Sequence, residues 1–518
     1  MKKLQVITHA LFTTSFFLFM GFSSSSSPSA MFQKPRLPYM TAEVEDISGM
    51  YLDYIVVGGG ASGCPLAATL SEKFSVLLVE RGGSPYGDPV ISESKNYGLA
   101  MMQTDEFSSI AQSFVSEDGV MNHRGRVLGG STAINSRASK DYIERVGWDE
   151  RLVRDAYEWV ESKMVFEPNE LRTKVGGSIF DGHGKRHSSA DLLSAGNLNR
   201  ITVLLNATVK NVIFHHNGDG SNPMAHGIRF IKSDGSDDTT YDAYLNKPKD
   251  SRSMGDVILS AGALGSPQIL MLSGIGSQEH LKHFNISPLI NATEVGKDIK
   301  DNPCISLLID CPETIKPDRP QIVGITQDFQ TIIQSVNRYV NQNQNKLLIV
   351  AKVAFPVSKG KLELKNTDPR QNPSVRFNYL AEKKDLDKCV KMGHLIEKVA
   401  LSNSIKLFLK SQLNGTVKKS SSEELREFCK KNVRTYYHYH GGCGIGSVVD
   451  EDYKVYGTKG LRVVDGSTLP DSPGTNPMAT LLMLGRYQGI KILKERDEAL
   501  LNCLPEFSNQ YLTTHFNA

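Results

Sequence analysis

The stretch that decides the fold is DYIVVGGGASGCPLAATLSEKFSVLLVERGG, residues 53–83. Residues 54–57 are apolar and β-branched and predict a buried strand, and the small apolar residues 64–70 predict a helix packed on a sheet. A second apolar segment predicts another strand, which ends at Glu80, 22 residues after Gly58. The G-x-G-x-x-G pattern lies between the first strand and the helix. This order of strand, glycine turn, helix, strand and acid is the fingerprint of a dinucleotide-binding unit.

Each residue type in the fingerprint has a physical reason. Gly58 permits the tight turn, Gly60 lets the backbone approach a pyrophosphate, and Gly63 lets the helix pack closely on the strand. The helix N-terminus presents unpaired N–H groups to the phosphates. Glu80 would accept hydrogen bonds from the ribose hydroxyls, which favours FAD or NAD over a 2′-phosphorylated cofactor. The cofactor-binding residues predicted from this segment are Gly58, Gly60, Ala61, Ser62, Gly63, Glu80 and Arg81.

Composition and the N-terminus narrow the class of protein. The 518 residues are 40% hydrophobic and 22% charged, and the net charge is only +3 without a long Lys/Arg run, so we expect no nucleic-acid partner. The apolar run LFTTSFFLFMGF follows two lysines and precedes a serine-rich stretch, which predicts a cleaved signal peptide at residues 1–24 and a secreted or endomembrane-lumen protein. A membrane anchor is the weaker alternative, because spanning a bilayer takes roughly 20 apolar residues. Glycosylation sequons occur at Asn206, Asn285, Asn291 and Asn414.

Further glycine-rich segments extend the pattern. HRGRVLGGSTAIN (123–135) exposes backbone around its glycines, and GDVILSAGALGSPQILMLSGIG (255–276) predicts a strand, a turn and an amphipathic helix. DGSTLPDSPGTNP continues into a helix that begins after Pro477. Together with VGKDIKDNP (295–303) and YHYHGGCGIG (437–446), these motifs resemble the glucose–methanol–choline (GMC) oxidoreductase family, and within it the plant hothead-like and mandelonitrile-lyase-like branch.

The resemblance implies a flavoprotein that binds FAD and acts on a small alcohol or cyanohydrin. The implied fold is α/β (α+β overall), with a Rossmann-type FAD-binding domain and a discontinuous antiparallel-sheet substrate domain. We expect a monomer without stable membrane insertion. The implied segments are 50–135, 176–305 and 430–500 for the FAD-binding domain, 136–175 and 306–429 for the substrate-binding domain, and 501–518 for a tail.

The resemblance also assigns individual residues. The strand-like segment ITVLLNATVKNVIF (201–214) matches the family segment that reads the adenine near Val209, and Cys389 and Cys429 match the positions of a family disulfide. Asp465 matches an aspartate at the flavin's ribityl–phosphate region, with capping of the following turn as its structural alternative. The additional cofactor-binding residues implied are Val127, Gly130, Ser131, Asn135, Val209, Asp465, Gly466, Asn476 and Pro477.

The segment TYYHYHGGCG (435–444) carries the predicted catalytic base. The resemblance places His438 at the flavin's reactive face, with Asn476 as its partner and Tyr436 as a substrate-binding side chain. An imidazole suits removal of a hydroxyl proton, and an amide can hold the same oxygen without competing for that proton. If 436–440 were extended, Tyr436, His438 and His440 would share a face; we expect His440 to pack behind the pocket and no metal to bind.

Three activities remain open at the level of sequence. Alcohol oxidation is favoured, because the lyases of this branch pair two histidines whereas this chain has Asn476. Mandelonitrile-type lyase activity is the alternative. An impaired flavoprotein is the third, because INSRASKDY, the segment after Phe166 and the region 312–346 are shorter than is usual in the family. Within that last region, the polar run QSVNRYVNQNQNK predicts a loop or a surface helix end.

Overall fold

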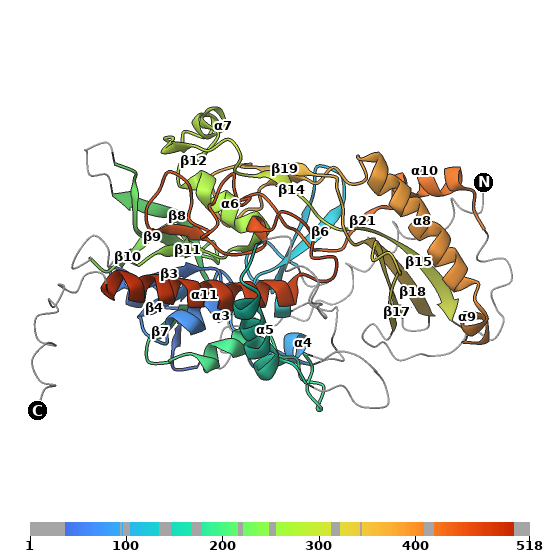
Figure 1. Ribbon diagram of the computed structural model, residues 1–518, viewed down its shortest axis with the longest axis horizontal. Coiled ribbons are helices and arrows are strands. Elements are labelled where there is room, and N and C mark those ends of the chain that lie inside the picture. Colours follow the sequence, from blue (N-terminus) through green and yellow to red (C-terminus); the bar gives the residue numbers. More distant parts are fainter. Residues whose placement is uncertain are drawn as a thin grey trace, which may run out of the picture. The chain divides into compact units, whose positions relative to one another are not determined.

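The strands on either side of the glycine turn form the centre of a six-stranded parallel sheet in the computed structural model of the chain (Figure 1). The structure describes residues 37–93, 96, 104–133, 147–166, 179–215, 221–247, 255–311, 322–341, 344–408 and 419–501, which belong to one compact unit. The strands of this sheet, in spatial order, are β1 (Met40–Thr41), β7 (Ile201–Leu204), β4 (Val76–Val79), β3 (Tyr54–Val57), β11 (Val257–Leu259) and β22 (Leu461–Val463).

Alternation along β3 and β4 supplies two cores, one on each face of the sheet. Ile55 and Val57 join one buried cluster, and Tyr54 and Val56 join the other, because successive strand residues point to opposite faces. The strand order reverses at β3, since β4 lies on one side of it and β11 on the other. In open α/β sheets, such a reversal leaves a crevice at the carboxyl ends of the strands, and the Gly58–Gly63 turn begins there.

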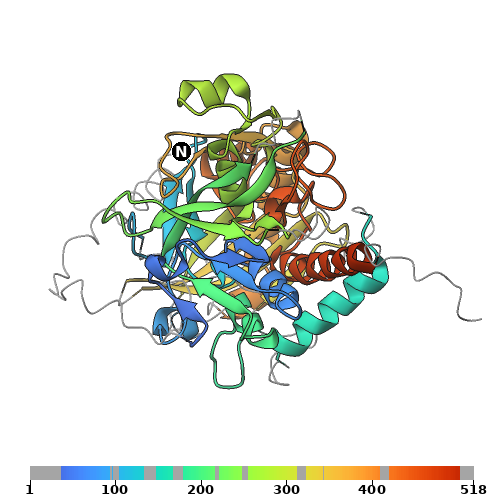
Figure 2. The ribbon, with the colours of Figure 1, turned by 90° about the vertical axis from the view of Figure 1, so that its left-hand side faces the viewer.

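Three helices cover one face of the parallel sheet, and a second sheet with one helix covers the other (Figures 1 and 2). The first group is α3 (Gly63–Leu70), α5 (Glu150–Met164) and α11 (Met478–Leu501). The second is α6 (Gly262–Leu272) with a four-stranded sheet of β2 (Tyr51–Leu52), β10 (Tyr241–Leu245), β9 (Met224–Lys232) and β8 (Ala207–His215). Burial of both faces explains the continuous apolar character of the central strands.

A five-stranded, antiparallel sheet forms the other end of this unit, with α8 and α10 on one of its faces (Figure 1). Its order is β16 (Ile322–Ile325), β17 (Thr331–Asn341), β18 (Gln344–Val353), β15 (Pro303–Cys311) and β21 (Arg434–Thr435). The helices of this region are α8 (Lys383–Ala400), α9 (Asn403–Phe408) and α10 (Ser422–Asn432). The opposite face of the sheet carries the candidate active site described below.

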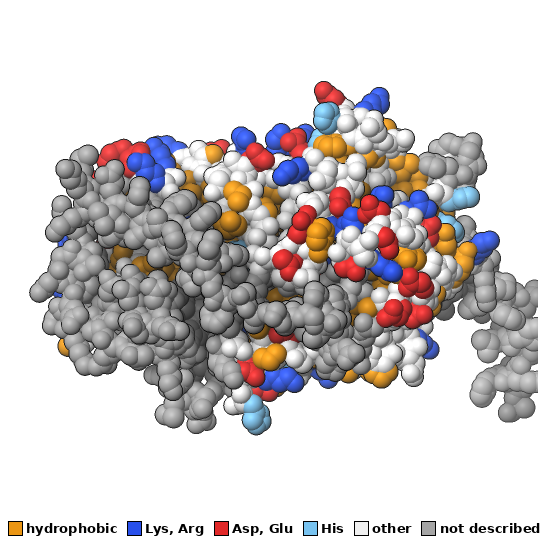
Figure 3. All heavy atoms as spheres, turned by 180° about the vertical axis from the view of Figure 1, so that it is seen from behind, with side chains coloured by type: hydrophobic (Ala, Val, Ile, Leu, Met, Phe, Trp, Pro, Cys, Tyr) orange, Lys and Arg blue, Asp and Glu red, His pale blue; other side chains and the backbone are white. Residues whose placement is uncertain are grey.

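Smaller elements connect these layers. The remaining strands are β5 (Ala111–Val115), β6 (Met121–Gly125), β12 (Ile275–Gly276), β13 (Ile290–Asn291), β14 (Lys297–Ile299), β19 (Gly360–Glu363) and β20 (Ser374–Arg376). The short helices are α2 (Val44–Ile47), α4 (Pro89–Ser92) and α7 (Gln278–His283), with 3-10 turns η4 (Gly130–Ala133), η6 (Ser189–Ala195) and η7 (Gly466–Thr468). Within the described ranges, no helix is long and apolar enough to cross a membrane. Figure 3 shows acidic and basic side chains interspersed on one face.

The strand character predicted for 201–214 is confirmed, but as two strands in different sheets, because Asn206 adopts a left-handed conformation (φ 56°) that turns the chain between β7 and β8. Two other predictions of local structure are wrong. Helix α6 is not amphipathic as predicted: every residue from Ala263 to Met271 is buried, so the helix has no polar face. In the polar run, residues 334–341 lie on β17 and residues 344–346 lie on β18, where ladder pairing overrides the polar composition.

Candidate active site

The glycine turn has the shape that a pyrophosphate requires. A Cβ atom on Gly58 (φ 103°) would lie 2.4 Å from the carbonyl oxygen of Ser260, and one on Gly63 would lie 1.9 Å from that of Gly58. A Cβ on Gly60 would meet nothing nearer than Gly130 at 4.0 Å, so space is open beside this backbone. The first and third glycines are therefore required by packing, whereas the second leaves room for a ligand.

The N-terminus of α3 is free to receive an anion. Ser62 precedes the helix but makes no capping hydrogen bond, and its hydroxyl instead donates to the carbonyl oxygen of Leu481 in α11 at 3.0 Å. Ala61 lies in the same turn, between Gly60 and Ser62. N–H groups at such a helix start are a ready site for phosphate.

Glu80 lies buried at the end of β4. Its carboxylate accepts hydrogen bonds from the N–H groups of Gly59 and Gly82, at 2.9 and 2.8 Å, and burial raises its pKa. The N–H of Ala207, two residues before Val209, donates to the backbone carbonyl of Glu80, so the predicted adenine segment lies beside the predicted ribose acceptor. A carboxylate offers about four lone-pair sites, which leaves capacity for ribose hydroxyls.

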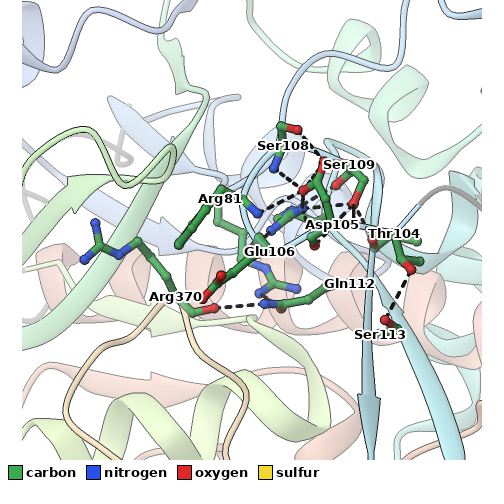
Figure 4. Close-up of polar contacts among 12 residues, drawn as sticks. Arg81, Thr104, Asp105, Glu106, Ser108, Ser109, Gln112, Ser113 and Arg370 are labelled. Atoms are coloured by element: carbon green, nitrogen blue, oxygen red, sulfur yellow. Dashed lines mark hydrogen bonds and ion pairs between the residues drawn. The ribbon is translucent and has the colours of Figure 1, made fainter. Parts of the chain in front are cut away.

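Arg81 has a structural partner rather than a free side chain. Its guanidinium donates to the side-chain oxygen of Gln112 at 2.8 Å (Figure 4). Arg124 donates to the same oxygen at 3.2 Å. The Gln112 amide in turn donates to the carbonyl oxygen of Arg370 at 3.0 Å. Burial lowers the pKa of Arg81 to about 10. This network joins the end of β4 to the β5–β6 hairpin, so the Arg81 side chain has a structural role beside the glycine turn.

The other predicted cofactor residues lie around the same turn. Val127 is buried and its neighbour Leu128 donates to Gly83, while the N–H of Gly129 donates to Gly59, so the two glycine loops are joined. Ser131 is exposed at the loop's rim. Gly130 lies so close to Gly60 that a Cβ on it would be 2.8 Å from the Gly60 Cα. Asn135 lies outside the described residues.

Asp465 caps the turn η7. Its carboxylate accepts from the N–H of Gly262 and from the N–H and hydroxyl of Ser467, at 2.8, 2.8 and 2.6 Å. The Ser266 hydroxyl also donates to it, at 2.5 Å, and burial raises the pKa of Asp465. The capping role proposed as its structural alternative is therefore present, and Gly466 follows it, buried beside the backbone of Tyr439.

The geometry fits FAD. Open space beside Gly60, an uncapped helix start at α3 and a buried acid at the end of β4 provide the positions for a pyrophosphate and a ribose. In addition, His440 Nε2 and the Thr475 hydroxyl are buried without a hydrogen-bond partner among the described residues. Buried polar atoms normally have a hydrogen-bond partner, so these two unpaired atoms fit contact with a polar ligand.

His438 is held in place by its backbone. It is 2% exposed, and its N–H donates to Asp301 Oδ1 at 2.8 Å. Two residues later, the backbone of His440 exchanges hydrogen bonds with that of Lys300, at 2.8 and 3.0 Å. The premise of an extended segment is wrong, because Tyr437 has φ 62° and turns the chain between Tyr436 and His438.

Residues 300–302 form a hub, which we name the 300–302 segment. Asn302 donates its amide to the carbonyl oxygens of Val353 and Ala354, at 2.7 and 2.8 Å, and accepts from the Ser472 hydroxyl at 3.1 Å. The Lys300 ammonium donates to the Pro470 carbonyl oxygen at 2.9 Å. Three distant segments, around His438, the end of β18 and the loop before α11, therefore meet at one point.

Lys352 is the unexpected member of the site. It lies on β18 with no exposed surface, and its Nζ is 3.0 Å from His438 Nδ1. Burial lowers the pKa of Lys352 to about 7, although the charge of Asp301 opposes the shift. Burial, with the charge of Lys352, lowers the pKa of His438 well below its ordinary value, so the imidazole is neutral.

Tyr436 packs on this pair. Its ring lies 5.0 Å from that of His438, centre to centre, and Lys352 Nζ lies 5.1 Å from its centre. Its hydroxyl donates to Gln334 on β17. His440 donates through Nδ1 to the His438 carbonyl oxygen at 2.9 Å, and burial lowers its pKa to about 4. His440 is thus a neutral, buried residue behind His438.

Asn476 is 7% exposed and, like the buried Pro477, lies in the loop that the 300–302 segment anchors. Cys389 and Cys429 form a disulfide between α8 and α10, with Cα atoms 6.2 Å apart, as predicted. Two sequons are at exposed positions, Asn285 and Asn291; Asn206 is half-buried, and Asn414 lies outside the described residues.

Sequence reasoning missed Asp301, Asn302, Gln334 and Lys352 as site residues. A signal for Lys352 was present, because one lysine interrupts the apolar run LLIVAKVAF. Its neighbours Ala351 and Val353 join the core beneath α8, so strand alternation directs Lys352 to the opposite face. A lysine that is fully buried within an apolar strand is a candidate functional residue.

Comparison with known proteins defines the class. Residues 174–304 and 356–485 match the two family models described as GMC oxidoreductase. The chain is 38% identical to Protein HOTHEAD and 40% identical to an (R)-mandelonitrile lyase-like protein, both of Arabidopsis thaliana, over 86% of this chain and 88% and 90% of theirs. It is 37% identical to sinalpyl alcohol oxidase Nec3 of Nesocodon mauritianus, over 86% of this chain and 89% of that one.

The chain therefore belongs to the GMC oxidoreductase family, as its motifs predicted, and FAD is its cofactor. The fold is also that of solved structures. Pyridoxine 4-oxidase from Mesorbium loti superposes with a TM-score of 0.68 at 19% identity, over 85% of this chain and 98% of that one. Formate oxidase from Aspergillus oryzae gives 0.66 at 18% identity, over 87% and 100%.

Proposed function

We propose that this chain is a secreted, FAD-dependent oxidoreductase that oxidises the CH–OH group of a small alcohol to an aldehyde. His438 Nε2 removes the hydroxyl proton, and the Asn476 amide donates a hydrogen bond to the same oxygen. Bound FAD supplies the acceptor for the hydride that leaves the carbon. Tyr436 shapes the wall beside His438, and the 300–302 segment holds both loops so that the reacting groups converge.

The observation that carries the proposal is the state of His438. The imidazole is buried and neutral, its backbone is fixed by Asp301, and Nδ1 faces Lys352. Among the described residues, no hydrogen bond engages Nε2. A general base needs a nitrogen that no other protein group engages and a fixed position, and this side chain has both.

A lyase is the second candidate, because several relatives that are 35–37% identical bear the name (R)-mandelonitrile lyase. The same base could remove the hydroxyl proton of a cyanohydrin, with cyanide as the leaving group and no net oxidation. Asn476, in place of the second histidine of those lyases, favours oxidation. An impaired flavoprotein is less favoured, since the five-stranded sheet beside the pocket is continuous across its described strands.

The test is anaerobic mixing of the purified protein with a panel of primary alcohols while the flavin absorbance is followed. Bleaching of the flavin by one alcohol class supports oxidation. Cyanide release from mandelonitrile without bleaching by any alcohol supports the lyase, and neither response supports the impaired protein.

Two variants assign the base. His438→Ala should slow flavin reduction by about 10³-fold, within the range for loss of a general base. His394→Ala is the matched control, because His394 is half-exposed on α8 and pairs with Glu397. Equal rates for both variants would remove His438 from the mechanism.

The remaining parts of the proposal concern the whole protein. We propose that residues 1–24 are removed on export, that the chain is a monomer and that the FAD-binding and substrate-binding segments have the boundaries given above. The exposed sequons at Asn285 and Asn291 support export. N-terminal sequencing of the secreted protein and its mass in solution test these points.

A further inference from the structure

Within the part of the chain that the structure describes, no ion pair involves Lys352. It is fully buried, and its Nζ contacts His438 Nδ1 at 3.0 Å. On the neighbouring strands, Lys352 lies opposite Ile332 of β17 and Cys304 of β15. The polar and aromatic groups that interact with it are Asp301 of the 300–302 segment and Tyr436, His438 and His440 of the His438 loop. Burying an ammonium in such surroundings is unfavourable, so a purely structural role does not explain a lysine here.

The contact decides which nitrogen of His438 carries hydrogen. When Lys352 is an ammonium, it donates to Nδ1, so the proton of the neutral imidazole is on Nε2, and Nε2 cannot act as a base. When Lys352 is a neutral amine, the imidazole N–H is the better donor and the amine the better acceptor. Nδ1–H then donates to Nζ, and Nε2 carries the lone pair.

We propose that Lys352 is the second half of the base: as His438 Nε2 takes the substrate's hydroxyl proton, the Nδ1 proton of His438 passes to Lys352 Nζ. The substrate O–H and the Nδ1–H bonds break, and Nε2–H and Nζ–H bonds form. The imidazole is neutral before and after, and the positive charge arises on Lys352. This inference rests on the proposed function, but its first test does not require turnover.

The relay explains where the charge goes. A protonated His438 would carry its charge in a buried site next to His440, whose own pKa burial lowers to about 4. On Lys352, the charge is opposed by burial but favoured by the carboxylate of Asp301 and the face of the Tyr436 ring. Lys352 is a positioning residue in this scheme, because it reaches the substrate only through His438.

The first test is the tautomer of His438, observed by NMR of protein labelled with ¹⁵N-histidine, with His438→Gln to assign the signal. In the wild type, hydrogen should be on Nε2 at about pH 6 and on Nδ1 at about pH 9, because Lys352 loses its proton between them. In Lys352→Met, the tautomer should not change. An identical tautomer at both pH values in the wild type would overturn the proposal, whatever the activity.

The second test is the rate of flavin reduction against pH. The wild-type rate should rise with pH through a midpoint near that of Lys352. Lys352→Arg keeps a permanent cation on Nδ1 and should be slower by about 10² to 10⁴-fold at every pH. Lys352→Met should be slower by about tenfold and lose the midpoint. Lys361→Met, an exposed lysine paired with Glu363, is the control.

Flavin content and melting temperature should be measured for each variant, so that a folding defect is not taken for a kinetic one. A Lys352→Arg enzyme within about threefold of the wild type, or a Lys352→Met enzyme that keeps the wild-type midpoint, would overturn the relay. A wild type that no alcohol reduces, but whose tautomer switches with pH as expected, would remove the proposed oxidation and leave the paired base standing.

Discussion

Asp301→Ala should destabilise the protein strongly, because the buried carboxylate accepts four hydrogen bonds. The N–H groups of Asn302 and His438 donate to Oδ1, and the hydroxyls of Tyr379 and Thr435 donate to Oδ2. The hydroxyls can rotate, but the two backbone N–H groups are fixed in direction. A buried donor without an acceptor costs roughly 1–3 kcal/mol, so the pair predicts a loss of about 2–6 kcal/mol in the free energy of unfolding.

Asp301→Asn is the matched control. The amide oxygen can still accept from both N–H groups, while the amide nitrogen can donate to the two hydroxyl oxygens. The loss should be about 1 kcal/mol or less. Urea unfolding of both variants is followed by circular dichroism at one fixed excess of FAD, because bound cofactor adds stability by mass action. If Asp301→Ala loses no more than Asp301→Asn, the carboxylate does not hold the His438 loop.

The Asp301→Asn variant also tests the electrostatic effect of Asp301 on Lys352, because it keeps the hydrogen bonds and removes the charge. Asp301 raises the pKa of Lys352 against the effect of burial, and its own pKa, which burial raises to about 6, leaves it charged above that value. Removing the charge should lower the pKa of Lys352. The amine form then appears at lower pH, so the midpoint of flavin reduction in Asp301→Asn should shift to lower pH. An upward shift would contradict the electrostatic reasoning.

Three further outcomes follow from the geometry. Gly60→Val should abolish FAD retention with little change in the melting temperature of the apoprotein, because its side chain occupies open space beside the turn; a yellow purified variant would contradict this. Cys389→Ser should cost roughly 2–4 kcal/mol in unfolding, because the link to Cys429 closes a 40-residue separation; FAD binding, measured by fluorescence, should persist. Asn285→Gln and Asn291→Gln should each remove one glycan from the secreted protein, seen as a mass step, and an unchanged mass would refute that site.

The parts of the fold that sequence predicted are those that neighbouring residues determine. The turn from β3 to α3 needs Gly58 at positive φ and no Cβ at Gly63, and both requirements are local. Where partners far along the chain decide, prediction was wrong. Residues 334–341 and 344–346 are in strands only because β17 pairs with β18, and β18 also pairs with β15. A single left-handed residue, Asn206, divides the strand-like segment 201–214 into two strands.

The candidate site divides in the same way. The resemblance of the motifs predicted His438 and Asn476, but not what holds them, because the supporting atoms come from segments without a sequence signature. Asp301 fixes the backbone of His438 through one carboxylate, and no pattern in DIKDNP reveals that contact. Lys352 could have been suspected only as a charge in an apolar run. The antiparallel ladder sets Lys352 opposite Cys304, and this pairing does not reveal the contact of its Nζ with His438.

The 300–302 segment explains why one site can be assembled from three distant stretches. Its three residues bond to the His438 loop, to the end of β18 and to the loop that carries Asn476. Each of these bonds is short and buried or partly buried, so displacing any one segment leaves polar groups unpaired in the others. The base, its lysine and the amide that would hold the substrate are thus coupled through the backbone of one short turn. In the proposed reaction the substrate loses a proton to His438 and a hydride to the flavin. Such a reaction requires this kind of fixed alignment, because a small displacement of either acceptor raises the barrier steeply.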